Sequence, residues 1–134
     1  MKVSHIAIGC ADLDKVADFW THVLGLKQAF KMDREDGTPW IVYLDAGPDC
    51  FVELLARGGE PSELPRTGLS HVCMEVEDMT AELERLAGLG VEPQDPPKRA
   101  SDGNLQAWVT DPEGNRVELM ELSPEGRQRT YRKA

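Results

Sequence analysis

Residues 3–6 of the chain read Val-Ser-His-Ile, and residues 69–72 read Leu-Ser-His-Val, so a similar stretch returns 66 positions later. An acidic residue that can cap a helix follows each copy, Asp12 in the first and Asp78 in the second. Residues 52–55, Val-Glu-Leu-Leu, return 65 positions later as Val-Glu-Leu-Met. The chain therefore reads as two copies of one unit, each with a His near its first strand and a Glu in its last.

Each copy has the pattern of one strand, one helix and three strands. In the first copy, apolar residues at helical spacing predict a helix over residues 12–24, which Gly25 ends. A second helix is predicted over residues 79–89, closed by Gly90. Strands are expected at residues 3–9, 26–32, 40–45 and 50–55 in the first copy, and at 69–76, 91–93, 105–110 and 115–122 in the second.

The predicted fold class is α+β, with two tandem βαβββ modules that form a curved, barrel-like mixed sheet and carry the helices outside. We expect one domain over residues 1–134, with modules at about 1–56 and 68–122. A linker rich in Gly and Pro covers residues 57–67, and residues 123–134 form a tail. The basic residues of the tail are expected to be a solvated end rather than a binding arm.

Composition excludes several classes of protein. The net charge of −9 over 134 residues argues against a phosphate backbone as partner, so no nucleic-acid binding is expected. Three cysteines without a CxxC spacing argue against a disulfide framework and fit a reducing cytoplasm. Because no long apolar run or N-terminal signal is visible, we expect no membrane partner.

Strand periodicity predicts where the four His and Glu residues of the repeat point. Side chains alternate between the faces of a strand, and the apolar residues beside these four supply the face that the helices cover. His5, Glu53, His71 and Glu118 then lie together on the opposite face. Two imidazoles and two carboxylates suit a divalent first-row metal, with open positions for a substrate that has adjacent oxygens. A lone His on a strand is more often structural, so the prediction depends on the repeated pattern.

Two further residues are candidates for substrate binding. Arg116 shares the face of Glu118 and could pair with an anionic group, although a salt bridge at the strand edge explains it equally well. Trp108 could line a pocket, as could Trp20 and Trp40, and core packing is an equal alternative for each.

Four segments carry a resemblance to the vicinal oxygen chelate superfamily, the glyoxalase, bleomycin-resistance and extradiol-dioxygenase group. They cover about residues 1–122 and comprise residues 3–8, 12–20 with 23–26, 68–72 and 111–119, the last reading Asp-Pro-Glu-Gly-Asn-Arg-Val-Glu-Leu. Within this superfamily, the order His, Glu, His, Glu resembles glyoxalase I, lactoylglutathione lyase.

The resemblance implies a lyase or isomerase that transfers a proton through a metal-bound enediolate. It favours Glu118 as the base, with Glu53 as its pseudo-symmetric partner, and Lys98 and Arg99 as the basic residues of the later loop. The short chain is similar to the nickel or cobalt type, with Zn, Mn or Fe as alternatives. The resemblance also implies a homodimer, and it does not fix whether the site lies within one chain or between two.

The chain departs from the glyoxalase I pattern after Glu53, where residues 54–59 contain no Asn to hold glutathione. Another thiol adduct or another substrate with adjacent oxygens therefore stays open. Three alternatives also stay open: a superfamily epimerase, an Fe(II) extradiol dioxygenase or thiol transferase that needs only His5, His71 and Glu118, and a non-catalytic module that sequesters a ligand.

Overall fold

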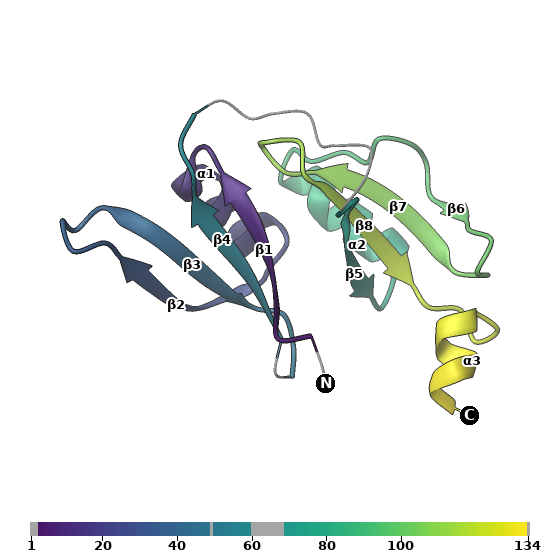
Figure 1. The fold of residues 1–134 in the computed structure, drawn as a ribbon. Helices are drawn as coiled ribbons and strands as arrows, with labels where there is room; N and C mark the ends of the chain where they lie inside the picture. The colour runs from purple at the N-terminus through teal and green to yellow at the C-terminus, as the bar shows by residue number, and fades with distance from the viewer. Residues whose placement is uncertain (1–2, 49, 60–68, 134) are drawn as a thin grey trace. The chain divides into compact units, whose positions relative to one another are not determined.

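The computed structural model describes residues 3–48, 50–59 and 69–133. They divide into two compact units, residues 1–63 with 111–114 and residues 64–110 with 115–134. Each unit contains one four-stranded sheet, with α1 in the first unit and α2 and α3 in the second (Figure 1). Most of the predicted linker, residues 60–67, lies outside the described residues.

The first unit follows the predicted order of elements. Its sheet has the strand order β1-β4-β3-β2, in which β1 runs parallel to β4 and the other pairs are antiparallel. The elements are β1 (His5–Cys10), α1 (Leu13–Asp18), a π-helical segment (Phe19–Val23), β2 (Lys27–Asp33), β3 (Pro39–Asp45) and β4 (Phe51–Ala56).

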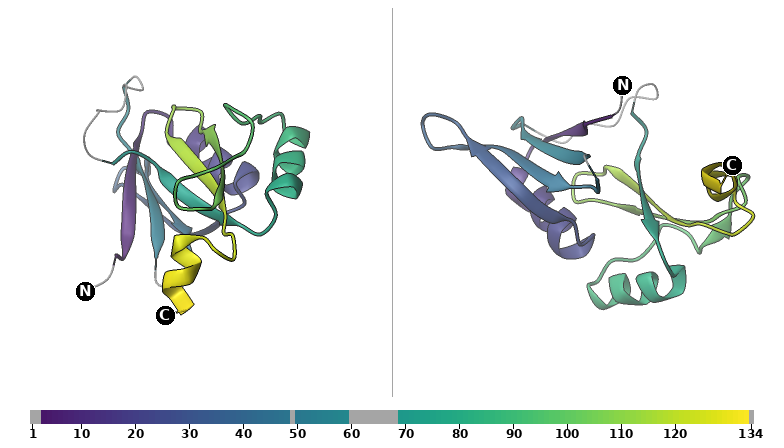
Figure 2. Two further views of the ribbon diagram at one scale, coloured as in Figure 1. Left: turned by 90° about the vertical axis from the view of Figure 1, so that its right-hand side faces the viewer. Right: turned by 90° about the horizontal axis from the view of Figure 1, so that it is seen from below.

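The predicted helix over residues 12–24 is therefore present, but its second part is π-helical. Asp12 caps it through its side chain, which accepts a hydrogen bond from the Lys15 backbone N–H at 3.1 Å. Gly25 follows with φ of 78°, a conformation that favours glycine and ends the helix. The apolar side of the helix, with Val16 and Trp20 fully buried, contributes to the core of this unit. Figure 2 shows α1 on one side of the sheet only.

The second unit repeats this plan with the order β5-β8-β7-β6, again with one parallel pair. Asp78 caps α2 through the Ala81 backbone N–H at 3.0 Å, as Asp12 caps α1. Glu121 joins the helix to the sheet, because its carboxylate accepts the Met79 backbone N–H at 2.7 Å. The elements are β5 (Val72–Val76), α2 (Met79–Gly88), β6 (Lys98–Arg99), β7 (Leu105–Thr110), β8 (Arg116–Glu121) and α3 (Arg127–Lys133).

One predicted strand is wrong. Residues 91–93 form no strand, and the two-residue strand β6 holds the outer position of the sheet instead. The Val91 backbone N–H bonds back to Leu86 at 2.9 Å and so completes the helix end. Pro93, Pro96 and Pro97 follow, and because proline has no N–H to donate, this stretch cannot form a regular ladder.

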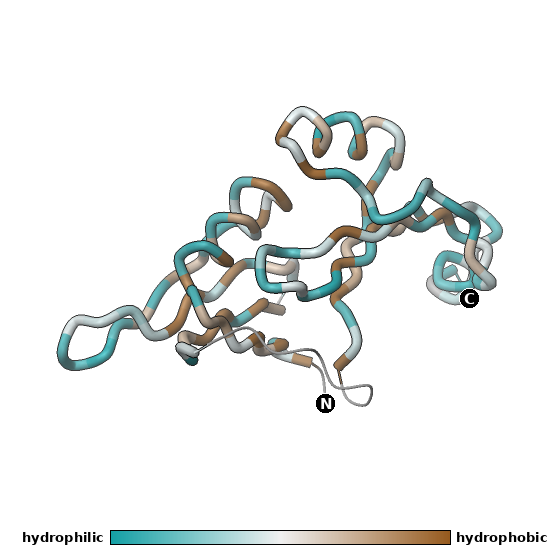
Figure 3. The backbone as a smooth tube through the Cα atoms, turned by 90° about the horizontal axis from the view of Figure 1, so that it is seen from above, coloured by the Kyte–Doolittle hydropathy of each residue, from teal (hydrophilic) through white to brown (hydrophobic). Residues whose placement is uncertain are grey.

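The predicted α+β fold class is confirmed, and the strands of the described residues form two four-stranded sheets that are curved and not closed. The loop between β2 and β3 is the most hydrophilic end of the first sheet (Figure 3), and all seven residues of β2 are exposed. The core of this unit is therefore built by the helix with β1, β3 and β4. None of the described helices is long and apolar enough to cross a bilayer.

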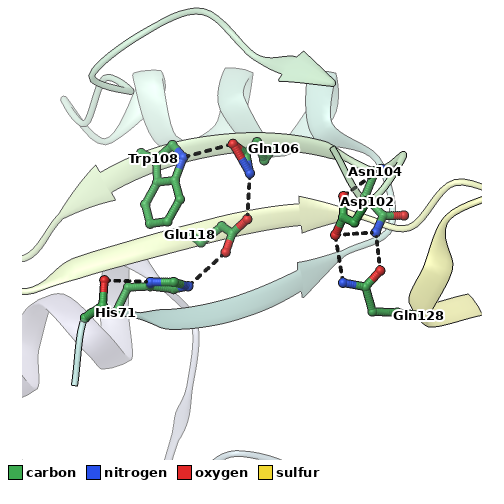
Figure 4. Close-up of polar contacts among 8 residues, drawn as sticks. His71, Asp102, Asn104, Gln106, Trp108, Glu118 and Gln128 are labelled. Carbon is green, nitrogen blue, oxygen red and sulfur yellow. Dashed lines mark hydrogen bonds and ion pairs between the residues drawn. The ribbon is translucent and has the colours of Figure 1, made fainter. Parts of the chain in front are cut away.

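The predicted tail forms a helix in which the basic residues Arg127 and Lys133 are exposed. Residues 127–133 form α3, and a polar network ties this helix to the start of β7 (Figure 4). Asn104 is fully buried and donates to Asp102 at 3.0 Å and to Gln128 at 2.6 Å. Its carbonyl accepts the Ser123 backbone N–H at 3.0 Å, and Gln128 in turn donates to Asp102 at 2.7 Å. The network satisfies every polar atom of the Asn104 side chain.

Candidate metal centre

The first unit holds one of the two predicted pairs. His5 begins β1, and Glu53 lies in β4, where Ala7 and Tyr43 are its partners across the two neighbouring strands. The His5 Nε2 and Glu53 Oε2 atoms are 3.1 Å apart, and the Tyr43 hydroxyl donates to the same Oε2 at 3.0 Å. Glu53 is only 7% exposed, so its carboxylate needs these donors to offset the loss of water.

The second unit holds the corresponding pair. His71 precedes β5, Glu118 lies in β8, and their Nε2 and Oε2 atoms are again 3.1 Å apart. Figure 4 shows the polar contacts that continue from this pair on both sides. The Gln106 amide donates to Glu118 Oε1 at 2.9 Å, and the Trp108 indole N–H donates to the Gln106 carbonyl oxygen at 3.4 Å. The His71 Nδ1 atom lies 3.2 Å from the Ser70 hydroxyl.

The alternation predicted for the strands is confirmed within each unit. Val52 and Leu54 are buried on either side of Glu53, as Val117 and Leu119 are around Glu118. Each Glu therefore points away from the apolar face that its helix covers. Glu118 is 6% exposed, so both carboxylates are withdrawn from solvent although they lie opposite the core.

Aromatic rings surround both pairs, in different arrangements. In the first unit, Phe30 stacks on Tyr43 at 4.5 Å between ring centroids, and Phe51 meets Tyr43 edge to face at 5.9 Å. In the second unit, His71 meets Trp108 edge to face at 4.9 Å, and the Arg116 guanidinium lies 4.2 Å from the centre of the Trp108 ring. This geometry orients the His71 ring against Trp108 and places a cation over the Trp108 ring.

The other predicted substrate-binding residues lie in β6 of the second unit. Lys98 and Arg99 are exposed there, and one Arg99 nitrogen donates to the Gly103 carbonyl at 2.6 Å and to the Ser123 hydroxyl at 2.8 Å. Of the other two tryptophans, Trp20 is buried and donates to Asp111 at 3.0 Å. Trp40 lines a hollow of about 280 Å³ in the first unit, whose lining includes neither His5 nor Glu53.

Three residues near the carboxylates of Glu53 and Glu118 were not predicted from the sequence. Tyr43 and Gln106 donate hydrogen bonds to them, and Cys73 lies opposite Glu118 on the neighbouring strand. The hydrogen bond to Glu53 raises the pKa of Tyr43, and desolvation followed by the charge of Glu118 raises the pKa of Cys73 to about 12. The repeat contained a signal for Tyr43, because Tyr43 and Trp108 stand 65 positions apart, as Glu53 and Glu118 do.

The geometry of each pair fits a divalent metal. Two ligand atoms at about 2.1 Å from one ion and at right angles to each other are about 3.0 Å apart, close to the 3.1 Å between imidazole and carboxylate in both units. Without a metal, the same spacing is an ordinary hydrogen bond. Among residues 3–48, 50–59 and 69–133, no three His, Cys, Asp or Glu side chains gather as ligands, so each unit supplies a pair.

The fold and the duplicated pair define a member of a known superfamily. A model of the Glyoxalase/Bleomycin resistance protein/Dioxygenase superfamily matches residues 2–119, and the chain belongs to this superfamily. Members of this superfamily generally bind a divalent metal. The solved structure of SMU.1112c superposes with a TM-score of 0.78 at 26% identity, over 90% of this chain and 98% of that one.

Similar proteins have two kinds of name. Lactoylglutathione lyase GLX1 of Arabidopsis thaliana is 28% identical over 90% of this chain, which spans only 44% of the plant protein. A probable lactoylglutathione lyase of Synechocystis is 26% identical over 92% of this chain and 97% of its own length. An ethylmalonyl-CoA/methylmalonyl-CoA epimerase of Cereibacter sphaeroides is 31% identical over 66% of this chain and 71% of its own.

Proposed function

We propose that the chain is a divalent-metal-dependent lyase or isomerase of the glyoxalase I type, acting on a small molecule with adjacent oxygens. The observation that supports this proposal is the duplicated pair, an imidazole Nε2 and a carboxylate Oε2 at 3.1 Å in both units. Withdrawing a carboxylate from water costs free energy, and the fold alone does not require this cost at the same position of both units.

His5, Glu53, His71 and Glu118 would hold the metal, with nickel or cobalt favoured by the resemblance. When bound, such an ion acts as a Lewis acid that polarises a carbonyl oxygen of the substrate. A carboxylate of the site, that of Glu118 or of its pseudo-symmetric partner Glu53, would supply the proton chemistry, because an ionised carboxylate can accept the proton of the carbon next to the carbonyl. Return of that proton to the neighbouring carbon completes an isomerisation without any outside oxidant or reductant.

Substrate contacts would come from the second unit. Trp108 offers a ring beside His71, and Arg116 adds a cation next to that ring. Lys98 and Arg99 would provide further positive charge for an anionic group, although Arg99 already bonds within its own unit. We also propose a cytoplasmic homodimer, an arrangement that would supply two equivalent sets of the four ligands.

Metal binding tests the proposal first. Chelator-stripped protein is titrated with Ni²⁺, Co²⁺, Zn²⁺ and Fe²⁺ by calorimetry, beside Glu53→Ala and beside Glu35→Ala, an exposed position of the first unit that serves as the control. We expect one metal per site and a loss of affinity of about tenfold or more for Glu53→Ala only.

Turnover is then measured with thiohemiacetals of 2-oxoaldehydes, formed with glutathione and with other thiols, and followed by NMR. Metal-dependent conversion to the hydroxy-acid thioester would support the proposal. Metal binding that ignores Glu53→Ala would instead favour the three-ligand dioxygenase or thiol transferase. No metal binding at all would favour a module that sequesters a ligand.

A second candidate is an epimerase, and it is favoured by the relative from Cereibacter sphaeroides. It would use the same proton chemistry on one carbon next to a thioester carbonyl. The identity of residue 53 argues against this candidate, because the resemblance implies that methylmalonyl-CoA epimerases have Gln at the position of Glu53. Exchange of the α-proton of an acyl-CoA for deuterium in D₂O, without conversion of thiohemiacetals, would support the epimerase and contradict the lyase.

A further inference from the structure

The two carboxylates have different partners at the same position of the sheet. Tyr43 is directly opposite Glu53 in the pairing of β3 with β4, and Trp108 is directly opposite Glu118 in the pairing of β7 with β8. The Tyr43 hydroxyl donates straight to its carboxylate. The Trp108 indole N–H instead donates to Gln106, which passes a hydrogen bond on to Glu118 (Figure 4).

The orientation of the Gln106 amide follows from its neighbours. An indole N–H can only donate, and an ionised carboxylate can only accept. The amide oxygen therefore faces Trp108, and the amide NH₂ faces Glu118. The corresponding position of the first unit, 65 residues earlier, is Ile41, which is 7% exposed and has no polar side-chain atom. The first unit has no residue that can do what Gln106 does at this position.

Glu118 is therefore held at both oxygens. Its Oε1 accepts from Gln106 at 2.9 Å, and its Oε2 contacts His71 at 3.1 Å. Any rotation of this carboxylate breaks one of these contacts, or both. A carboxylate that keeps one oxygen on a neutral donor and offers the other to a metal is a fixed ligand.

Glu53 is held at one oxygen only. Its two partners, Tyr43 and His5, both contact Oε2, at 3.0 Å and 3.1 Å. Its Oε1 accepts no hydrogen bond from the residues that the structure describes, so a proton can be placed there without displacing another donor. An acid–base group needs an open position of this kind next to its substrate.

We propose that Glu53 is the carboxylate that moves the substrate proton, that Glu118 is the fixed ligand, and that Gln106 is the positioning residue that keeps Glu118 fixed. This assignment rests on the proposed function and reverses the preference for Glu118 that the resemblance suggests. The reason is local, because both oxygens of Glu118 contact neighbouring side chains, whereas only one oxygen of Glu53 does.

Two reciprocal substitutions test the assignment. Glu53→Gln is expected to lose less Co²⁺ affinity than Glu118→Gln and to lose turnover by about 100-fold or more, because a neutral amide cannot accept the proton. Glu118→Gln is expected to lose Co²⁺ affinity by about tenfold or more. Calorimetry gives the affinities without any turnover. The reverse pattern, or equal losses of affinity, overturns the assignment.

Gln106→Leu tests the positioning residue, with Gln94→Leu as the matched control at an exposed position of the same unit. We expect Gln106→Leu to weaken Co²⁺ binding by about tenfold, because the donor that orients Glu118 is lost. The visible spectrum of the Co²⁺ complex should also change. Unchanged affinity and spectrum would remove Gln106 from the assignment.

The same measurements separate this assignment from the proposed function. If the unaltered chain binds no metal, or binds metal and moves no proton, the proposed function fails and the assignment fails with it. If the unaltered chain binds metal and converts substrate while the reciprocal substitutions show the reverse pattern, only the assignment of Glu53 and Gln106 fails.

Discussion

The His–Glu pair of the first unit and that of the second unit have the same backbone geometry and different side-chain support. Both join Nε2 to Oε2 at 3.1 Å. The His71 Nδ1 atom, however, lies 3.2 Å from the Ser70 hydroxyl, and the His71 and Trp108 ring centroids are 4.9 Å apart. The His5 and Tyr43 ring centroids are 6.2 Å apart, and no Ser contact to His5 is found among the described residues. The side chain of His5 is 45% exposed, against 33% for His71.

This difference shows what a duplicated fold keeps and what it leaves free. The register of the strands fixes which residue stands opposite each Glu, and the two registers agree. The chemistry of that opposite residue is free to change, because a hydroxyl and an indole fit the same position. The result is a second pair with more restraints than the first, and restraint lowers the entropy that a ligand loses on binding.

The largest expected effect is on metal affinity when the more restrained imidazole is removed. His71→Ala is expected to lower Co²⁺ affinity by about 100-fold, and His5→Ala by about tenfold, because the oriented ligand contributes more to binding. Calorimetry on stripped protein measures both, with His22→Ala as the control at an exposed helix position. Equal losses for His5→Ala and His71→Ala would show that the extra contacts of His71 do not matter.

The next largest effect is on folding stability, and it distinguishes the buried hydrogen bonds around Asn104 in the second unit from the exposed turn around Thr38 in the first. Asn104→Ala is expected to lower the free energy of unfolding by about 2 kcal/mol, because it leaves buried partners of a fully buried side chain unsatisfied. Thr38→Ala, in the exposed turn of the first unit that Asp36 closes, should have a much smaller effect. Urea denaturation measures both. A loss for Asn104→Ala no larger than that for Thr38→Ala would contradict the role of the buried network.

A smaller effect is expected from converting the second unit to the arrangement of the first. Gln106→Ile combined with Trp108→Tyr places a hydroxyl opposite Glu118, as Tyr43 stands opposite Glu53. Relative to Gln106→Ile alone, the added substitution should recover most of an about tenfold loss in Co²⁺ affinity, because a direct donor to the carboxylate returns. Failure to recover would mean that Trp108 supports His71 more than it supports Gln106.

The smallest effect is a dependence of stability on pH in the second unit. Hydrogen bonds from Asn104 and Gln128 hold the pKa of Asp102 below its ordinary value of 3.8. Because the folded-state pKa is the lower one, this stabilisation is present above the ordinary pKa and is lost as the pH falls through the folded-state value. Asp102→Asn should therefore flatten the fall in unfolding free energy below about pH 4. Urea denaturation at several pH values measures this, and parallel curves for both proteins would contradict it.

The fold was predictable because each copy carries its own local signals. Asp12 and Asp78 cap helices where their spacing indicated, and the strands that alternate clearly begin and end within a few residues of their predicted positions. Residues 91–93 misled the prediction, because the three residues Val-Glu-Pro are too short a pattern to separate a strand from a connection.

The candidate site was predictable in part. The repeat selected His5, Glu53, His71 and Glu118, and the structure pairs them within each unit. Gln106 was not predictable, because its role depends on an indole two residues along the same strand and on a carboxylate in the next strand. The polar network of the tail was not predictable for a similar reason, since the contact of Gln128 with Asp102 joins residues that are far apart in the sequence.

The sequence by itself determined the duplication, the order of elements and the face on which each Glu lies, because helix caps, turns and strand alternation act over a few neighbouring residues. Only the tertiary structure decided how each Glu is held. Hydrogen bonds such as those from Tyr43 to Glu53 and from Gln106 to Glu118 join separate strands, and their partners are set by the pairing of strands in space rather than by neighbours in the chain.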